Sequence, residues 1–170
     1  MTGPDHPGID SEIKTFLRAA RRALGIGGQV DVRITSNHEM RRLNRDFRGK
    51  DTPTDVLSFP AAQNGKIAGD IAISRDIARQ NAKLLGHPLA TEVRILLLHG
   101  LLHLAGHDHE SDHGEMAALE QKLRIELNLP ASLSERASEA SHKGYAEYGA
   151  SGHHTSPMSF ASAARKRKRS

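Results

Sequence analysis

Three histidines between residues 99 and 109 are spaced as ligands of a single metal ion would be. His99 and His103 are four positions apart, so a helix would carry both imidazoles on one face, about 5–6 Å from each other. Gly106 follows where a helix commonly ends, because glycine readily adopts the left-handed cap conformation. His109 lies on chain that can fold back toward the first two. We therefore predict that His99, His103 and His109 bind one Zn²⁺ ion, whose fourth coordination position stays open.

The same histidine and glycine spacing occurs in the long zinc-protease signature, with one difference. Those proteases carry a general-base glutamate directly after the first histidine, where this chain has Gly100. Peptide hydrolysis by the usual route is therefore disfavoured, and a zinc metalloprotease with another base is the weakest alternative. His107 and His113 are weaker ligand candidates and are interpreted as structural, exposed or alternative ligands.

Composition and the absence of apolar runs indicate where in the cell the protein is expected. Cysteine is absent, which excludes disulfides and thiolate zinc sites and fits a reducing cytoplasm. The N-terminus lacks a signal-peptide pattern, and no apolar run approaches the roughly 20 residues that span a bilayer. We therefore expect a soluble cytoplasmic protein with no membrane contact; the oligomeric state is left open.

Charge and composition divide the chain near Pro130. Residues 1–130 hold 17 basic and 17 acidic residues, so the net charge of +4 comes from residues 131–170. That C-terminal segment contains nine Ser and eight Ala, has no Ile or Val, and ends in the basic cluster Arg165–Arg169. Such a composition buries too little apolar surface to offset ordering entropy. We predict one domain over 1–130 and a disordered, Ser/Ala-rich tail over 131–170.

Hydrophobic periodicity predicts a small α+β domain. Three or four strands would form a sheet packed with helices, and the metal site would lie on a buried helix and the turn after it. The segments 56–59 and 69–74 are predicted to form an antiparallel pair. A further strand is expected over 30–34. One helix is expected to begin after the Ser36 cap. The other expected helices cover 11–24 and about 75–85, 90–105 and 112–127.

Several segments together resemble the YbeY family of bacterial rRNA maturation factors, which are metal-dependent endoribonucleases. The resemblance runs from about residue 30 to 127, and the order of the segments makes it highly specific. A departure is His107, where the family usually has tyrosine, and which could add a competing imidazole. The segments are LNRDFR at 43–48, TDVLSFP at 54–60, GDIAIS at 69–74 and HGLLHLAGHDH at 99–109.

The resemblance implies a zinc-dependent, single-strand-specific endoribonuclease. Its expected role is 16S rRNA 3′-end maturation and ribosome quality control, with single-stranded RNA, rRNA and ribosomal particles as partners. The resemblance also assigns zinc binding to His99, His103 and His109, and makes Arg48 the functional arginine near them.

The chemistry of phosphodiester cleavage favours the same arginine. Negative charge grows on the non-bridging phosphoryl oxygens, and a guanidinium fork suits that geometry and stays protonated. Arg48 stands at the head of a Gly/Pro loop, whereas Arg41, Arg42 and Arg45 are interpreted as a solvated helix face. Water and a ribose 2′-hydroxyl both remain possible attacking groups. The alternative is a non-catalytic ribosome-assembly factor in which zinc is structural.

Overall fold

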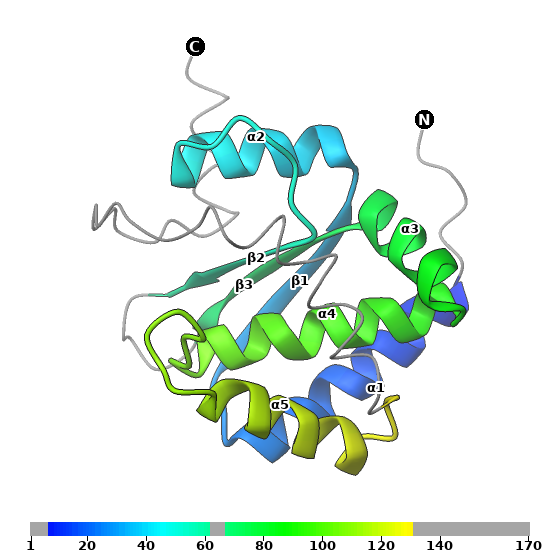
Figure 1. The fold of residues 1–170 in the computed structure, drawn as a ribbon, viewed down its shortest axis with the longest axis vertical. Helices are drawn as coiled ribbons and strands as arrows, with labels where there is room; N and C mark the ends of the chain where they lie inside the picture. The colour runs from blue at the N-terminus through cyan, green and yellow to red at the C-terminus, as the bar shows by residue number, and fades with distance from the viewer. Residues whose placement is uncertain (1–6, 62–66, 131–170) are drawn as a thin grey trace.

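The chain folds into a three-stranded sheet with helices on both faces (Figure 1). The computed structural model describes residues 7–61 and 67–130, so the predicted tail over 131–170 lies outside the described residues. None of the helices within these two ranges combines the length and apolar character needed to cross a membrane. In chain order the elements are α1 (Pro7–Leu24), β1 (Gln29–Thr35), α2 (Asn37–Arg48), β2 (Val56–Pro60), β3 (Ile67–Ser74), α3 (Arg75–Leu85), α4 (Leu89–Leu104) and α5 (Glu115–Glu126).

The order of elements confirms the predicted α+β architecture, while two helix starts differ from the prediction. α1 begins at Pro7, because proline is compatible with the first turn of a helix. α5 begins only at Glu115. The Asp112 side chain accepts hydrogen bonds from the backbone N–H groups of Gly114 (2.9 Å) and Met116 (2.7 Å), and Gly114 has a positive φ of 99°. These contacts form the turn that precedes the helix.

The strands lie in the order β1-β3-β2. β2 and β3 are antiparallel, as predicted, with Leu57 opposite Ala72. β1 pairs with β3 in parallel, with Val32 opposite Ile71. A parallel pair requires a crossover connection, and here the chain between the two strands contains α2 and β2.

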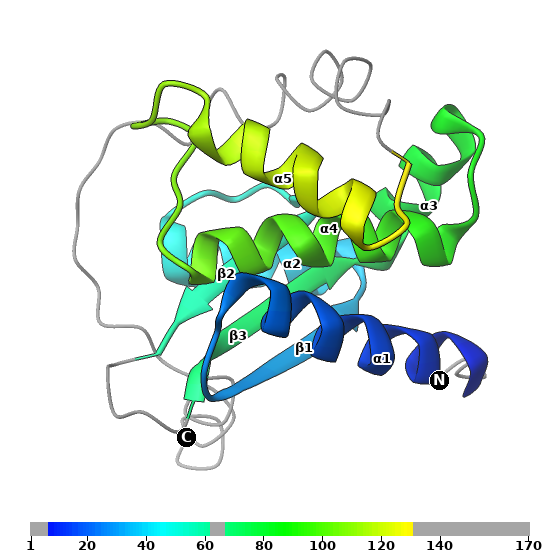
Figure 2. The ribbon, with the colours of Figure 1, turned by 90° about the horizontal axis from the view of Figure 1, so that it is seen from below.

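The two faces of the sheet carry cores of different size. Residues alternate between faces along a strand, so Ile71 and Ile73 join the larger core with α1, α4 and α5, and Ala72 joins a smaller one with Met40 and Leu43 of α2. Figure 1 shows α2 on one side of the sheet and α4 on the other. Seen from below in Figure 2, α4 lies between α1 and α5.

Helix α4 is the centre of the larger core and is apolar around most of its circumference, as expected of an enclosed helix. It contacts α1, α3, α5, β2 and β3. Full burial of a leucine contributes about 1.5–3 kcal/mol relative to exposure, which makes this helix a rigid support. The leucines of α4 that are completely buried are Leu97, Leu98, Leu101 and Leu102.

Two glycines allow close packing around β3. At Gly100 of α4, an added Cβ would lie 3.1 Å from both Ser58 Oγ and Ile71 Cγ2. The Ser58 hydroxyl donates a hydrogen bond of 3.0 Å to the Gly100 carbonyl. At Gly69, where φ is 154°, an added Cβ would lie 2.5 Å from the Phe59 carbonyl oxygen and 2.8 Å from Leu104 Cδ2. The helix and sheet therefore approach each other at distances that a larger residue would prevent.

We predict that Gly69→Ala lowers the free energy of unfolding by about 2–4 kcal/mol, because it combines a backbone conformation reserved for glycine with overpacking. Gly86→Ala is the matched control, since Gly86 also has a positive φ (70°) but has no atom within 4 Å of an added Cβ. Its expected cost is about 1 kcal/mol, from backbone strain alone. Urea unfolding measures both losses, and equal losses would contradict the packing argument.

Candidate metal centre

The end of α4 directs the chain back toward the helix. The N–H of Gly106 donates to the His103 carbonyl (3.0 Å) and that of His107 donates to the Leu102 carbonyl (3.1 Å). With Gly106 at a φ of 93°, these bonds form a Schellman motif, in which glycine at the left-handed position ends a helix. The turn that the sequence predicted at Gly106 is therefore present, and it brings His109 alongside α4.

His99, His103 and His109 lie together at this end of α4. One nitrogen atom of each imidazole lies within 4.8 Å of the others, and the Nε2 atoms of His99 and His103 are 3.2 Å apart. Zn–N bonds of 2.0–2.1 Å in a tetrahedral site place two ligand nitrogens about 3.3–3.4 Å apart. The spacing of His99 and His103 therefore fits two ligands of one metal ion, and His109 lies close enough to be a third. Within residues 7–61 and 67–130, this is the one group of three or more metal-ligating side chains brought together in this way.

His103 is neutral at neutral pH. Its burial, together with the neighbouring charges of His99, His109 and Arg48, lowers its pKa to about 4. Burial disfavours the imidazolium, and nearby positive charge acts in the same direction. A metal ion therefore does not have to displace a proton from this imidazole.

Helix α5 adds two charged residues that the sequence analysis missed. Glu120 Oε2 lies 3.0 Å from His99 Nδ1, and Arg124 Nε donates to Glu120 Oε1 at 3.1 Å. Burial acts to raise the pKa of Glu120, but the hydrogen bonds and charges of His99 and Arg124 outweigh it and lower the pKa to about 2. The available signal was position: Glu120 is four residues after Met116 and three before Leu123, both buried. A charged residue on such an apolar face requires a partner.

Arg48 is held near the histidine group through β2. It is the last residue of α2, and its Nη2 donates to the Ser58 carbonyl at 3.3 Å. The Ser58 hydroxyl in turn contacts Gly100, which follows His99 in α4. The Arg48 charge is close enough to contribute to the lowered pKa of His103. The structure therefore places the predicted arginine next to the predicted histidines.

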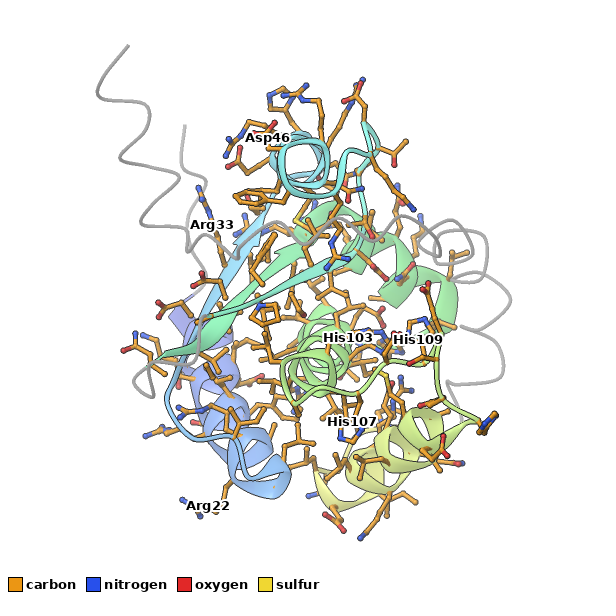
Figure 3. All side chains as sticks on the ribbon, turned by 90° about the vertical axis from the view of Figure 1, so that its left-hand side faces the viewer. Arg22, Arg33, Asp46, His103, His107 and His109 are labelled. Atoms are coloured by element: carbon orange, nitrogen blue, oxygen red, sulfur yellow. The ribbon has the colours of Figure 1, made fainter. Side chains whose placement is uncertain are left out.

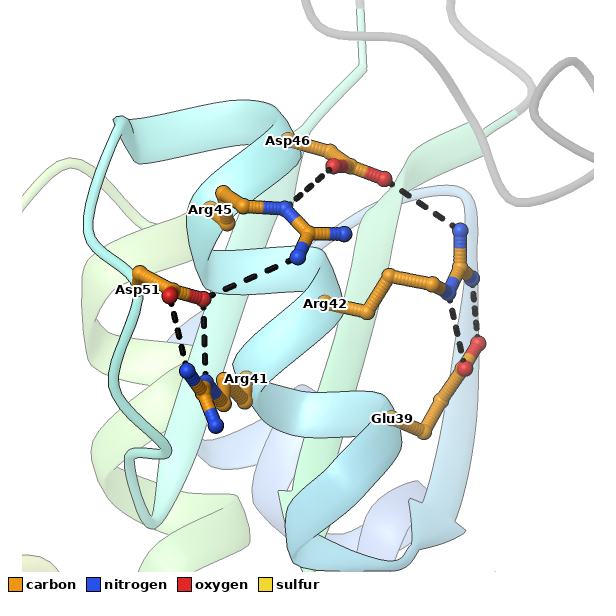
Figure 4. A network of polar contacts seen from close by, with 6 residues as sticks. All are labelled: Glu39, Arg41, Arg42, Arg45, Asp46 and Asp51. Atoms are coloured by element: carbon orange, nitrogen blue, oxygen red, sulfur yellow. Dashed lines mark hydrogen bonds and ion pairs between the residues drawn. The ribbon is translucent and has the colours of Figure 1, made fainter.

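The other arginines of α2 are engaged in ion pairs along the exposed side of the helix (Figure 4). Arg41 forms two hydrogen bonds with Asp51, at 2.9 and 2.7 Å. The shared carboxylates neutralise much of this local charge, which agrees with the interpretation of a solvated helix face. The other pairs are Arg42 with Glu39 and Asp46, and Arg45 with Asp46 and Asp51.

The remaining two histidines of the segment lie outside the group. His107 is half-buried, and Figure 3 shows it apart from His103 and His109, on the side of the turn that faces α5. His113 is exposed in the turn before α5. Neither belongs to the set of side chains close enough to share an ion, in agreement with their weaker rating from the sequence.

The chain is similar in sequence to several proteins that carry the same name. The chain is 58% identical over 134 residues to endoribonuclease YbeY of Koribacter versatilis, a match that covers 79% of this chain and 88% of that protein. It is 51% identical over 124 residues to endoribonuclease YbeY of Solibacter usitatus, covering 73% and 83% respectively.

The fold is also similar to the solution structure of a Thermotoga maritima protein. That match has a TM-score of 0.54 at 27% identity and covers 90% of this chain and 95% of the other. The family model described as endoribonuclease YbeY matches residues 5–128, which include every element of the fold and all three histidines. The chain therefore belongs to the YbeY family.

Proposed function

We propose that this protein is a zinc-dependent endoribonuclease that cleaves single-stranded RNA and acts in 16S rRNA 3′-end maturation and ribosome quality control. The observation that carries the proposal is the group of three imidazoles at the end of α4, with Arg48 held beside it. Relatives that carry the name endoribonuclease support the choice of RNA as substrate. rRNA and ribosomal particles are the proposed partners, and the reducing cytoplasm is the proposed compartment.

His99, His103 and His109 are the proposed ligands of one Zn²⁺ ion. The bound ion would supply Lewis-acid polarisation of a phosphoryl oxygen and a water molecule of lowered pKa. The buried part of α4 keeps two of the ligands in fixed positions, which preserves the geometry of the site. The Arg48 guanidinium then binds the non-bridging oxygens of the scissile phosphate as their negative charge grows.

The packing of the phenylalanines supports an RNA contact that depends on charge more than on base stacking. The chain has no Trp, and both Tyr lie beyond residue 130. Phe16 and Phe59 are buried, and Phe47 packs edge-on against Phe59 with 5.0 Å between the ring centroids. We assign activity to the domain over 1–130, and we retain the proposal of a separate tail over 131–170, which lies outside the described residues.

The packing at Gly100 weighs against a zinc protease. A Cβ there would already lie 3.1 Å from Ser58 Oγ and Ile71 Cγ2, so the glutamate that such proteases carry would be crowded at this position. The other alternative, a ribosome-assembly factor with a structural zinc, requires a closed coordination shell. Among the described residues, the group contains three histidines and no fourth metal-ligating side chain, and His109 is exposed.

An RNA cleavage assay tests the proposed activity. End-labelled single-stranded RNA is incubated with the protein alone, with a chelator, and with chelator followed by excess zinc, and the product ends are mapped. We expect cleavage that the chelator abolishes and zinc restores, and little cleavage of a duplex of the same sequence. A protein that binds zinc stoichiometrically but cleaves no RNA would instead favour the assembly factor.

Replacing one proposed ligand should show which histidines bind the metal and which only lie nearby. We predict that His103→Ala loses stoichiometric zinc and the zinc-dependent increase in thermal stability, because a metal stabilises the folded state by mass action. His107→Tyr is the matched control and should keep both. Zinc content and melting temperature measure the outcome. Full zinc content in His103→Ala would exclude it as a ligand, and loss of zinc in His107→Tyr would mean that another ligand set is used.

Removal of the arginine should affect cleavage without affecting the metal. We predict that Arg48→Ala retains zinc and lowers kcat by about 10²–10³-fold, the range for loss of one group that stabilises transition-state charge. Arg48→Lys should restore activity only in part, since an ammonium does not reproduce a two-pronged contact. Arg45→Ala, which removes an exposed arginine from the preceding turn of α2, is the control and should remain active. Full activity of Arg48→Ala would reduce this residue to a surface charge.

A further inference from the structure

Helix α5 places a buried ion pair against the histidine group. Glu120 and Arg124 are four residues apart and have side chains that are 14% and 7% exposed. The same helix carries a second pair with the same spacing, Lys122 and Glu126, whose side chains are 71% and 49% exposed and lie 3.8 Å apart. Exposed pairs of that kind are common on helices and contribute little. The buried pair therefore requires a separate explanation.

Because both side chains are buried, the Glu120–Arg124 ion pair contributes little to the stability of the fold. Desolvation of two charges offsets most of their attraction, and apolar residues of similar volume are often as stable. Arg124 Nη1 is buried without a hydrogen-bond partner, which adds to that cost. A buried pair of this kind is better explained by the residue that it contacts, His99.

The contact with His99 determines which ring nitrogen carries the hydrogen. Ionised carboxylate oxygens only accept hydrogen bonds. Glu120 Oε2, 3.0 Å from His99 Nδ1, therefore requires the hydrogen on Nδ1. The Nε2 atom of His99 is then left with its lone pair, and it is this atom that lies 3.2 Å from His103 Nε2. Only this tautomer offers a nitrogen ligand on the side where His103 lies.

We infer that Glu120 is a positioning residue that holds His99 in the tautomer and orientation required for metal binding, and that Arg124 holds the Glu120 carboxylate in place. The two oxygens of Glu120 have separate tasks, one toward His99 and the other toward Arg124 Nε and Nη2. Carboxylates that orient ligand histidines usually change metal affinity by 10–100-fold when they are replaced. The inference rests on the proposed zinc site.

Glutamine at position 120 cannot perform both tasks. If its amide oxygen accepts from Arg124, its NH₂ group faces His99 Nδ1 and favours the opposite tautomer; if it turns around, its NH₂ group faces the Arg124 donors. Glu120→Gln has nearly the same shape as the native side chain, so it tests hydrogen-bonding polarity and charge more than packing. Glu126→Gln makes the same chemical change in the exposed pair on the same helix and is the matched control.

The first measurement is the zinc dissociation constant, obtained by competition with a chromophoric chelator. We expect about a 10–100-fold weaker constant for Glu120→Gln and an unchanged constant for Glu126→Gln. Thermal unfolding of the metal-free variants separates a folding defect from a binding defect. If Glu120→Gln lowers metal-free stability but keeps the native zinc affinity, the pair only joins α4 to α5, and the inference is wrong.

The second measurement is the tautomer of His99 in the metal-free protein. Long-range ¹H–¹⁵N spectra of protein labelled at histidine distinguish the two tautomers at about pH 8, where imidazoles are neutral. We expect hydrogen on Nδ1 in the native protein and in Glu126→Gln, and a shift toward hydrogen on Nε2 in Glu120→Gln. Hydrogen on Nε2 in the native protein would overturn the inference even if Glu120→Gln failed to fold. Failure of the native protein to bind zinc would contradict the proposed function instead.

Discussion

The arrangement of the candidate site depends on the close approach of α4 to the sheet at Gly100. A Cβ at this position would lie 3.1 Å from both Ser58 Oγ and Ile71 Cγ2, so any larger residue would have to displace these side chains. Ser58 uses the short distance in two ways: its hydroxyl donates to the Gly100 carbonyl, and its own carbonyl accepts from Arg48. A helical position without a side chain therefore lets α4 lie close to β2, and the same residue of β2 also binds Arg48, which is far from the histidines in sequence.

The location at the C-terminal end of α4 also favours a cation. Unpaired carbonyl groups make this end of a helix partly negative, and His103 lies in the last turn of α4. The apolar residues that precede it keep the helix fixed and also exclude water from one side of the site. Burial of His103 keeps its imidazole neutral, with a pKa of about 4. The same burial therefore stabilises the fold and keeps this imidazole in the form that could bind a metal ion.

Local features of the site could be predicted from the residues themselves, whereas the nearness of Arg48 to the histidines was expected only from the family resemblance and the contact of Glu120 was missed. The i, i+4 spacing of His99 and His103 and the glycine turn depend on neighbouring residues, so both could be recognised directly. The antiparallel β2–β3 pair has only a short connection and was likewise predictable. By contrast, Glu120 and His99 are 21 positions apart in the sequence, and their contact depends on how α5 packs against α4. No periodicity within either helix specifies that packing, although a charged residue on an apolar face indicates that some partner must exist.

His109, the exposed member of the histidine group, is held by fixed structure on both sides. Before His109, the Schellman motif at Gly106 ties the turn to the last residues of α4. After it, Asp112 binds the N–H groups of Gly114 and Met116, and these hydrogen bonds keep the pKa of this carboxyl below its usual range. Because Met116 is buried in the core, the start of α5 is fixed as well. A short loop with two anchored ends has little freedom, so His109 stays near the helix although its side chain faces solvent. The contacts of Asp112 that hold the loop also fix the start of α5, and with it the position from which Glu120 contacts His99.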